Sequence, residues 1–258
     1  MARKEQAPAA GTAVVSWSEK LAKYASDAKS TEEGTGNFLS FKAGMMTLEG
    51  APLPGNEISC IILASLHENA LYPKYNPSQP QAPFCYAYGW GEDGEVMAPF
   101  EKVKDKRAPT CDICPNMVWG SDPEGSRGKA CKQTRRLAWI KADLLKDPDK
   151  LEKAPILYAK VPVMSVANWS AYVGVLAARN LPPWAVATRM FLQPHPKSQF
   201  QVWFEPQASI KDDGILTILE AKMQAARQNI MFPYPDPAPE TAPQITAQAA
   251  AKRKNFKG

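Results

Sequence analysis

The chain has 258 residues, of which 45% are hydrophobic and 22% charged, the balance of an ordinary soluble globular protein. Its 31 Lys and Arg against 26 Asp and Glu give a formal net charge of +5, which permits a polyanionic partner without requiring one. No apolar run reaches the roughly 18 residues of a membrane span, and the N-terminus, MARKEQAPAAGTAVVSW, lacks a signal core. We therefore expect a cytoplasmic protein without membrane contact.

The first half of the chain is predicted to be rich in strands. Residues 1–36 are dominated by Ala, Ser, Thr, Gly and charge, and we interpret them as a flexible segment. The proline-rich residues 72–83 read as a loop. Apolar patterning predicts three strands in this half: Phe38–Leu48, Glu57–Leu66 and Phe84–Trp90.

The second half mixes strands with two helices. Ser165 is a candidate N-cap for a helix to about Arg179, and Asp213 for a last helix to about Ile230. The first of these helices carries an apolar stripe at helical spacing: Val166, Trp169, Tyr172, Val173 and Leu176. Four further strands are predicted, the last two as a hairpin: Gln133–Ile140, Ile156–Val161, Ala185–Leu192 and Phe200–Phe204.

This order of elements predicts a mainly β (α+β) fold. A five-stranded barrel of the oligonucleotide-binding type, with a loop insertion and a C-terminal helix, suits it best, and a sandwich is the alternative. We expect a single β-rich domain over residues 37–232, in which a metal-pinned loop occupies about 85–132. Residues 233–258, rich in Pro and Ala and basic at the end, are predicted to be a disordered tail.

Cysteine spacing is the most specific signal in the chain. Cys111-Asp-Ile-Cys114 forms a knuckle that can present two thiolates to one metal ion, and Cys131 follows from a Gly-rich loop. Cys60 lies in a continuously apolar stretch and reads as a buried core thiol. Cys85, in the predicted aromatic strand, is then the fourth candidate ligand. Four soft ligands of this kind predict a structural zinc site.

Two other kinds of chemistry could use these cysteines. An iron–sulfur cluster is the serious competitor, because four cysteines serve either centre and Pro115 follows Cys114 as in some cluster motifs. A thioredoxin-like pair is disfavoured, since no βαβ context surrounds Cys111. Signs of an enzyme are thin: His67 and His195 lack a nucleophile by pattern, and no phosphate-binding loop is present. We expect no catalytic residues.

Cations interleaved with indoles surround the knuckle. Such a surface can neutralise phosphates and stack bases, although a solvated charged loop would look similar. If Gln133–Ile140 is a strand, Arg135 and Arg136 point to opposite faces, so only part of the set can act together. The candidate nucleic-acid-binding residues are Arg107, Trp119, Arg127, Lys129, Lys132, Arg135, Arg136 and Trp139.

The same block carries a resemblance. Cys111-x-x-Cys114-Pro-Asn-x-x-Trp-Gly-Ser121, then Gly128-Lys-Ala-Cys131-Lys-x-x-Arg-Arg-Leu137, resembles a block in a family of small, mostly uncharacterised proteins of tailed bacteriophages. The likeness covers roughly residues 80–205. The order of parts also looks like that of phage single-stranded DNA-binding proteins, which implies a zinc-bearing insertion in an oligonucleotide-binding barrel. This sequence departs from those proteins in two ways. Its ligand set would be four cysteines instead of one histidine and three cysteines, and its C-terminus is basic, whereas theirs is usually acidic.

Together these features predict a non-enzymatic, phage-encoded single-stranded DNA-binding protein of replication or recombination. It would act in the cytoplasm of a bacterial host, with phage or host replication proteins as possible partners and homo-oligomerisation possible. Two alternatives stay open. One is a protein-interaction module that redirects a host enzyme, and the other is an iron–sulfur protein acting on nucleic acid.

Overall fold

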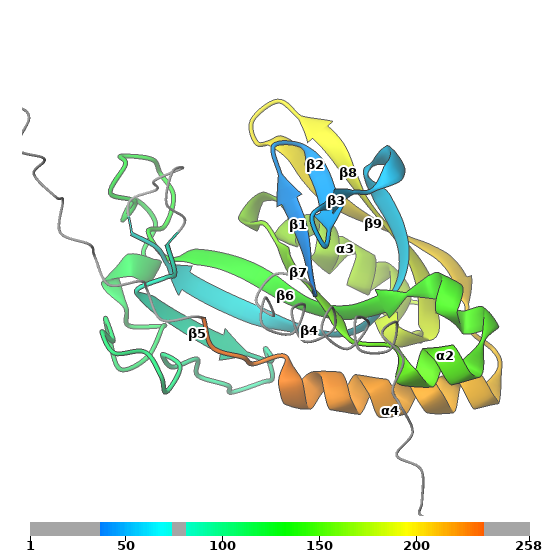
Figure 1. The fold of residues 1–258 in the computed structure, drawn as a ribbon. Coiled ribbons are helices and arrows are strands. Elements are labelled where there is room, and N and C mark those ends of the chain that lie inside the picture. The colour runs from blue at the N-terminus through cyan, green and yellow to red at the C-terminus, as the bar shows by residue number, and fades with distance from the viewer. Residues whose placement is uncertain (1–36, 74–80, 235–258) are drawn as a thin grey trace, which may run out of the picture. The chain divides into compact units, whose positions relative to one another are not determined.

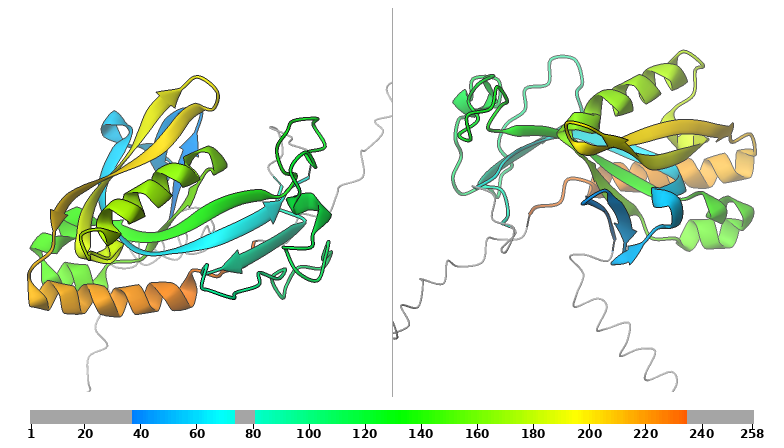
Figure 2. Two further views of the ribbon diagram at one scale, coloured as in Figure 1. Left: turned by 180° about the vertical axis from the view of Figure 1, so that it is seen from behind. Right: turned by 90° about the horizontal axis from the view of Figure 1, so that it is seen from above.

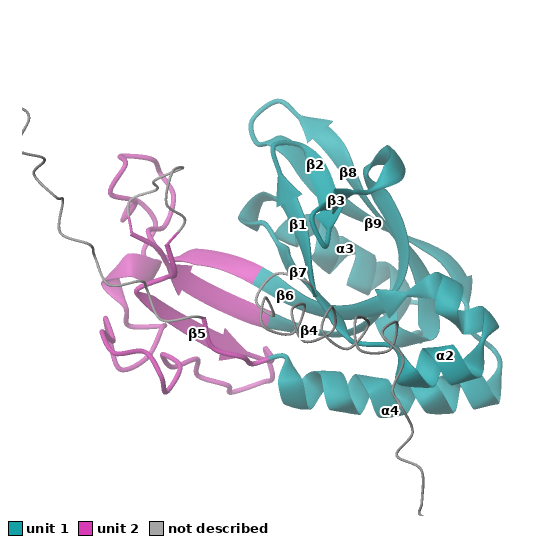
Figure 3. Cartoon of the chain, viewed as in Figure 1, with its two compact units in different colours: residues 1–66, 135–230 teal, residues 67–134, 231–258 magenta. Residues whose placement is uncertain are grey.

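The computed structural model describes residues 37–73 and 81–234 (Figure 1). The predicted flexible segment 1–36 and most of the predicted tail lie outside the described residues. Two compact units divide the chain, the first made of Met1–Leu66 and Arg135–Ile230, the second of His67–Thr134 and Met231–Gly258 (Figure 3). The single-domain boundaries 37–232 stay a prediction.

Strands dominate the described residues, and the expected mainly β fold with a few helices is confirmed. The helices are α2 (Pro148–Lys153), α3 (Val166–Ala177) and α4 (Asp213–Asn229). No described helix has the length and apolar character needed to cross a membrane. The strands are β1 (Phe38–Lys42), β2 (Met45–Leu48), β3 (Ala51–Pro52), β4 (Glu57–Leu71), β5 (Cys85–Gly89), β6 (Lys132–Lys141), β7 (Leu157–Val161), β8 (Val186–His195) and β9 (Gln199–Ser209).

The described strands form one sheet of nine in the order β3-β2-β1-β7-β6-β4-β8-β9, with β5 paired to β4 off this path. Strands β1 and β7 pair in parallel, with Phe38 opposite Tyr158, whereas the pairs β1–β2, β2–β3, β4–β5, β4–β8, β6–β7 and β8–β9 are antiparallel. In the first unit the sheet curls strongly but stays open (Figure 2), because its path ends at β3 on one side and β9 on the other. The sheet is therefore open and does not form a closed five-stranded barrel. The oligonucleotide-binding type of fold stays a prediction.

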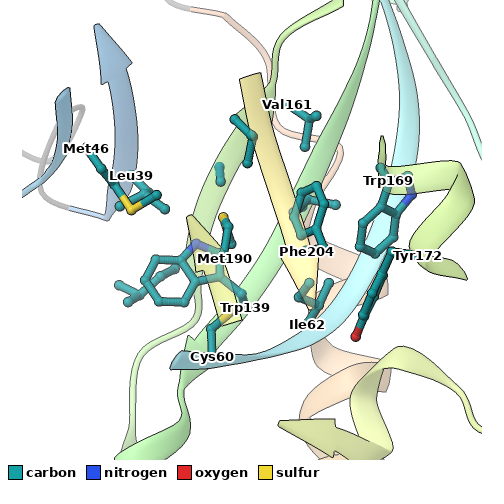
Figure 4. Close-up of a cluster of buried hydrophobic side chains, with 14 of the residues drawn as sticks. Leu39, Met46, Cys60, Ile62, Trp139, Val161, Trp169, Tyr172, Met190 and Phe204 are labelled. Carbon is teal, nitrogen blue, oxygen red and sulfur yellow. The ribbon is translucent and has the colours of Figure 1, made fainter. Parts of the chain in front are cut away.

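The hydrophobic core of the first unit lies between the curled sheet and α3 (Figure 4). Trp169, Tyr172 and Leu176 are buried from one face of α3, which confirms the predicted apolar stripe. The rings of Trp169 and Tyr172 pack on Phe204 of β9, with centroids 5.2 and 5.8 Å from that ring. Edge-on and tilted ring contacts of this kind stabilise a core beyond the area that they bury.

Ser165 occupies the predicted N-cap position of α3, whereas the cap of α4 is one residue before the predicted one. Ser165 precedes α3, but its side chain makes no cap and instead accepts a hydrogen bond from the backbone N–H of Val202 at 2.9 Å. Helix α4 is capped by Asp212 rather than by Asp213, because the Asp212 carboxylate accepts from the N–H of Ile215 at 2.9 Å. Which residue caps a helix depends on the backbone conformation at the start of that helix, and residue spacing alone does not reveal it.

We predict that Asp212→Ala lowers the free energy of unfolding by about 1 kcal/mol, because one N–H of the first turn of α4 loses its acceptor. Urea denaturation followed by circular dichroism measures this change. Asp212→Asn is the matched control, since an amide oxygen can accept the same bond and the loss should be small. Equal losses in both variants would mean that the charge of Asp212, and not its cap, matters.

Candidate functional site

Four of the five cysteines line a single small cavity in the second unit. Cys85 begins β5, Cys111 and Cys114 form the knuckle, and Cys131 directly precedes β6. The cavity has a volume of about 20 Å³, room for one ion or one water molecule. The structure therefore brings together the four residues that the sequence nominated as ligands.

Cys60 stands apart in the core of the first unit. Its side chain is completely buried and belongs to the hydrophobic cluster around α3, which confirms the expectation of a core thiol. Burial raises the pKa of the Cys60 thiol because the thiolate would lose its hydration. This cysteine is a small hydrophobic residue of the core.

Backbone hydrogen bonds hold the knuckle in its turn. The N–H of Cys114 donates to the carbonyl of Cys111 at 3.3 Å, and the N–H of Cys111 donates to Met97 O at 2.8 Å. The Asn116 side chain donates to the Cys114 sulfur at 3.8 Å. Cys131 is tied to the same turn, since its N–H donates to the carbonyl of Asn116 at 2.9 Å. The two halves of the cysteine set are thus joined through Asn116.

The thiols have electrostatics that suit a cation. Burial raises the pKa of Cys111, opposed by a hydrogen bond from Asn69 and reinforced by the neighbouring sulfurs of Cys85 and Cys114. Burial, followed by Cys111, Cys114 and Cys85, raises the pKa of Cys131 to about 12. Thiolates packed this closely repel one another and have little water, and a bound metal ion relieves both penalties. Among residues 37–73 and 81–234, no group of three or more His, Cys, Asp or Glu side chains is arranged so that it could hold a metal ion.

The loop between the knuckle and Cys131 is held by its own polar groups. The Ser121 hydroxyl lies 2.6 Å from Val118 O and accepts from the N–H of Ala130 at 3.0 Å. Across the loop, the N–H of Gly120 donates to Gly128 O at 2.9 Å. Gly120 has a φ of +84°, a left-handed conformation that glycine adopts without strain. These contacts fix the backbone immediately next to Trp119.

Asp122 is the second organiser of the same loop. Its carboxylate accepts from the Ser126 hydroxyl at 2.6 Å and from the N–H of Glu124 at 3.1 Å. These two bonds, the Ser126 one first, hold the pKa of Asp122 below its usual value. Lys132 Nζ lies 3.2 Å from the Asp122 carboxylate, so part of its charge is balanced within the loop.

Trp119 is the most exposed large hydrophobic side chain of the described residues, at 75% of its surface. The ammonium of Lys129 lies 5.1 Å from the centre of its ring, a cation–π contact. Arg127 is exposed on the same loop. Arg107 is also exposed; it pairs with Asp105 at 2.7 Å and lies 5.6 Å above the ring of Phe84. These candidates belong to the second unit with the cysteine cavity.

Three sequence-predicted binding residues do not join this surface. Trp139 has no exposed surface and lies in the core of the first unit (Figure 4), so it is not available to stack on a base. Arg136 is 2% exposed and donates to the carbonyl of Ile230, at the C-terminal end of α4, at 3.1 Å. Arg135 is half-buried in the first unit, and burial lowers the pKa of its guanidinium. Strand β6 has β7 and β4 as its neighbours in the sheet, and its Leu137–Ile140 segment is buried throughout.

Several residues of this surface were missed by sequence reasoning. Phe84, Ile113 and Val118 are 48%, 65% and 61% exposed, although all three are strongly apolar. The position of Ile113 inside the knuckle is a signal that could have found it, because a residue between the two cysteines of a tight turn has little room to fold inward. Within the described part of the second unit, acidic side chains outnumber basic ones, so the basic excess of the chain lies elsewhere.

Comparison of this chain with protein-family models, with curated proteins and with solved structures found no match. The resemblance to tailed-phage proteins therefore stays a prediction from the cysteine block.

Proposed function

We propose that the protein binds single-stranded DNA in phage replication or recombination, through a loop pinned by one zinc ion. The observation that carries this proposal is the placement of four cysteines around one cavity, on the loop that exposes Trp119 beside Lys129. In this proposal the curled, open sheet of the first unit serves in place of the closed oligonucleotide-binding-type barrel expected from the order of elements.

Zinc is favoured over an iron–sulfur cluster by the size of the cavity. A volume of about 20 Å³ suits one ion, whereas a cluster of several iron and sulfide atoms would have to push the cysteine segments apart. Cys85, Cys111, Cys114 and Cys131 would hold the ion. A bound zinc ion supplies no redox chemistry and contributes folding free energy directly.

Strand binding rests on stacking next to cations. The exposed indole of Trp119 presents a flat surface that any base can cover, and such stacking contributes about 1–3 kcal/mol for each base. Arg127 and Lys129 lie on the same loop and can neutralise phosphates. Arg107 and Lys132 are partly balanced by Asp105 and Asp122, so they add less charge to this surface.

A protein-interaction module is the second candidate, and the exposed apolar side chains favour it. Ile113, Val118 and Trp119 expose most of their surface on one loop, as the anchors of a protein interface do. Excess acidic groups in the described second unit would also suit a basic protein partner better than a nucleic acid. A host partner captured after nuclease treatment would support this candidate.

We predict that protein purified without chelators contains one zinc per chain, and that Cys111→Ser abolishes this because one of four thiolates is lost. Elemental analysis by mass spectrometry, with iron measured in parallel, gives the stoichiometry. Cys60→Ala is the matched control, since this cysteine is in the other unit and its loss should leave the metal content unchanged. If the wild-type protein instead contains iron and acid-labile sulfide, the site holds an iron–sulfur cluster and the zinc prediction is wrong.

We predict that Trp119→Ala weakens binding of an oligothymidylate by about 5- to 150-fold, the equivalent of one lost base stack. Fluorescence anisotropy of a labelled oligonucleotide measures the change in Kd. Trp203→Ala is the control, because Trp203 is 37% exposed and lies on β9 in the first unit. If the two variants weaken binding equally, the knuckle loop is not part of the binding surface.

We predict that the double variant Arg127→Gln/Lys129→Gln makes the dependence of log K on log salt shallower by about 1.4, which is two phosphate contacts at ~0.7 each. The measurement is an oligonucleotide titration at several salt concentrations. Arg179→Gln/Lys211→Gln, two exposed cations of the first unit, is the control of equal charge. If both pairs change the slope alike, general charge and not this loop governs binding.

A further inference from the structure

The second unit has a second cavity, separate from the cavity that the four cysteines line. Its volume is about 390 Å³, within the range of small-molecule sites. Eleven residues line it, among them three with aromatic and three with charged side chains. The six side chains are Phe84, Tyr86, Tyr234, Lys102, Lys104 and Asp105.

Two of the aromatic walls are rigidly held. Tyr86 is 6% exposed and stacks on Phe100, with ring centroids 5.6 Å apart and planes 26° apart. Tyr234 meets Tyr86 edge-on at 5.1 Å, and its hydroxyl donates a short hydrogen bond to the carboxylate of buried Glu68. Tyr234 belongs to the predicted tail 233–258, and the structure places this residue against Tyr86 of β5. Rings held in this way lose little entropy when a ligand packs on them.

The third wall is accessible to a ligand. Phe84 is 48% exposed, while its backbone is fixed, since its N–H donates to Leu71 O at 2.8 Å. The guanidinium of Arg107 lies 5.6 Å from the centre of the Phe84 ring. An exposed aromatic ring beside a cation repeats the arrangement of Trp119 and Lys129 on the knuckle loop.

The charge of the rim selects the class of ligand. An aromatic pocket with an acidic group would suit a quaternary ammonium ion. Here, however, Asp105 is paired with Arg107 at 2.7 Å, and Lys102 and Lys104 stand at the same rim. The local balance is therefore positive, and it favours a flat ligand that carries negative charge.

We infer that this cavity binds one nucleotide of an unpaired DNA strand, with its base on Phe84 and its phosphate between Lys102 and Lys104. This inference rests on the proposed function and adds a second contact point to it. Tyr86 lines this cavity and the cysteine cavity alike, so the proposed nucleotide site and the proposed metal site share one residue. A strand held on Trp119 would then gain a second stacked base.

The test is photo-crosslinking of the full chain, with zinc added, to oligothymidylate substituted with 5-iododeoxyuridine. Peptide mass spectrometry then locates the attached residue. We expect crosslinks at Phe84, Tyr86 or Tyr234 in addition to Trp119. Crosslinks at Trp119 without any at the three cavity rings would overturn the inference and leave the proposed function standing.

Variants provide the second measurement. Phe84→Ala should weaken oligonucleotide binding by about 5- to 150-fold, and Lys102→Gln/Lys104→Gln should make the salt dependence shallower by about 1.4. Val96→Ala, an exposed apolar residue of the same unit outside the cavity lining, should leave Kd unchanged. Phe84→Leu keeps apolar volume without a π face, so it separates stacking from folding if Phe84→Ala is unstable.

The outcomes separate the two proposals. Wild-type affinity and salt dependence in both Phe84 variants and in the lysine pair would overturn the nucleotide site alone. Absence of oligonucleotide binding by the zinc-loaded wild type would overturn the proposed function and this site together. Saturable binding of tetramethylammonium that Phe84→Ala abolishes, with no competition by thymidine monophosphate, would replace the nucleotide by a cationic ligand.

Discussion

The candidate site depends on the packing of four cysteines around one small cavity. Segments far apart in sequence meet there, namely the start of β5, the Cys111–Cys114 knuckle and the residue before β6. Neutral thiols hydrogen-bond weakly, so their mutual packing alone adds little order to the connecting loops. As thiolates they would repel one another, which makes the geometry of the whole region sensitive to a cation at the centre.

The exposure of Trp119 follows from this arrangement. The loop folds on polar groups, Ser121 and Asp122, and not on apolar ones, so it has no core into which an indole could turn. An indole held outside by a hydrogen-bonded backbone is already positioned for stacking. The loop is thus more ordered by its own hydrogen bonds than a flexible charged segment would be, and a bound ion would reinforce existing order.

The features that the sequence predicts correctly depend on residues adjacent in the chain. The errors concern burial against parts of the chain that are distant in sequence. The apolar stripe of α3 and the alternation of β7 are properties of adjacent residues, and both were predicted within a few positions. Arg136 and Trp139 were misassigned because burial of β6 depends on its neighbours β4 and β7, which come from distant parts of the chain. Cys85 is the fourth candidate ligand by elimination, because only one of the five cysteines lies in an apolar run, and the structure places it at the cysteine cavity while its role as a ligand stays a prediction.

The distribution of charge sets how such a surface would have to work. The chain is basic as a whole, yet acidic groups outnumber basic ones in the described part of the second unit. Phosphate neutralisation alone would therefore be a weak source of affinity there, because each cation acts against nearby carboxylates such as Asp105 and Asp122. Stacking does not have this handicap. Because the π face of a base is not repelled by a carboxylate in the way that a phosphate is, exposed rings beside single cations are the groups that can hold a strand on an acidic unit.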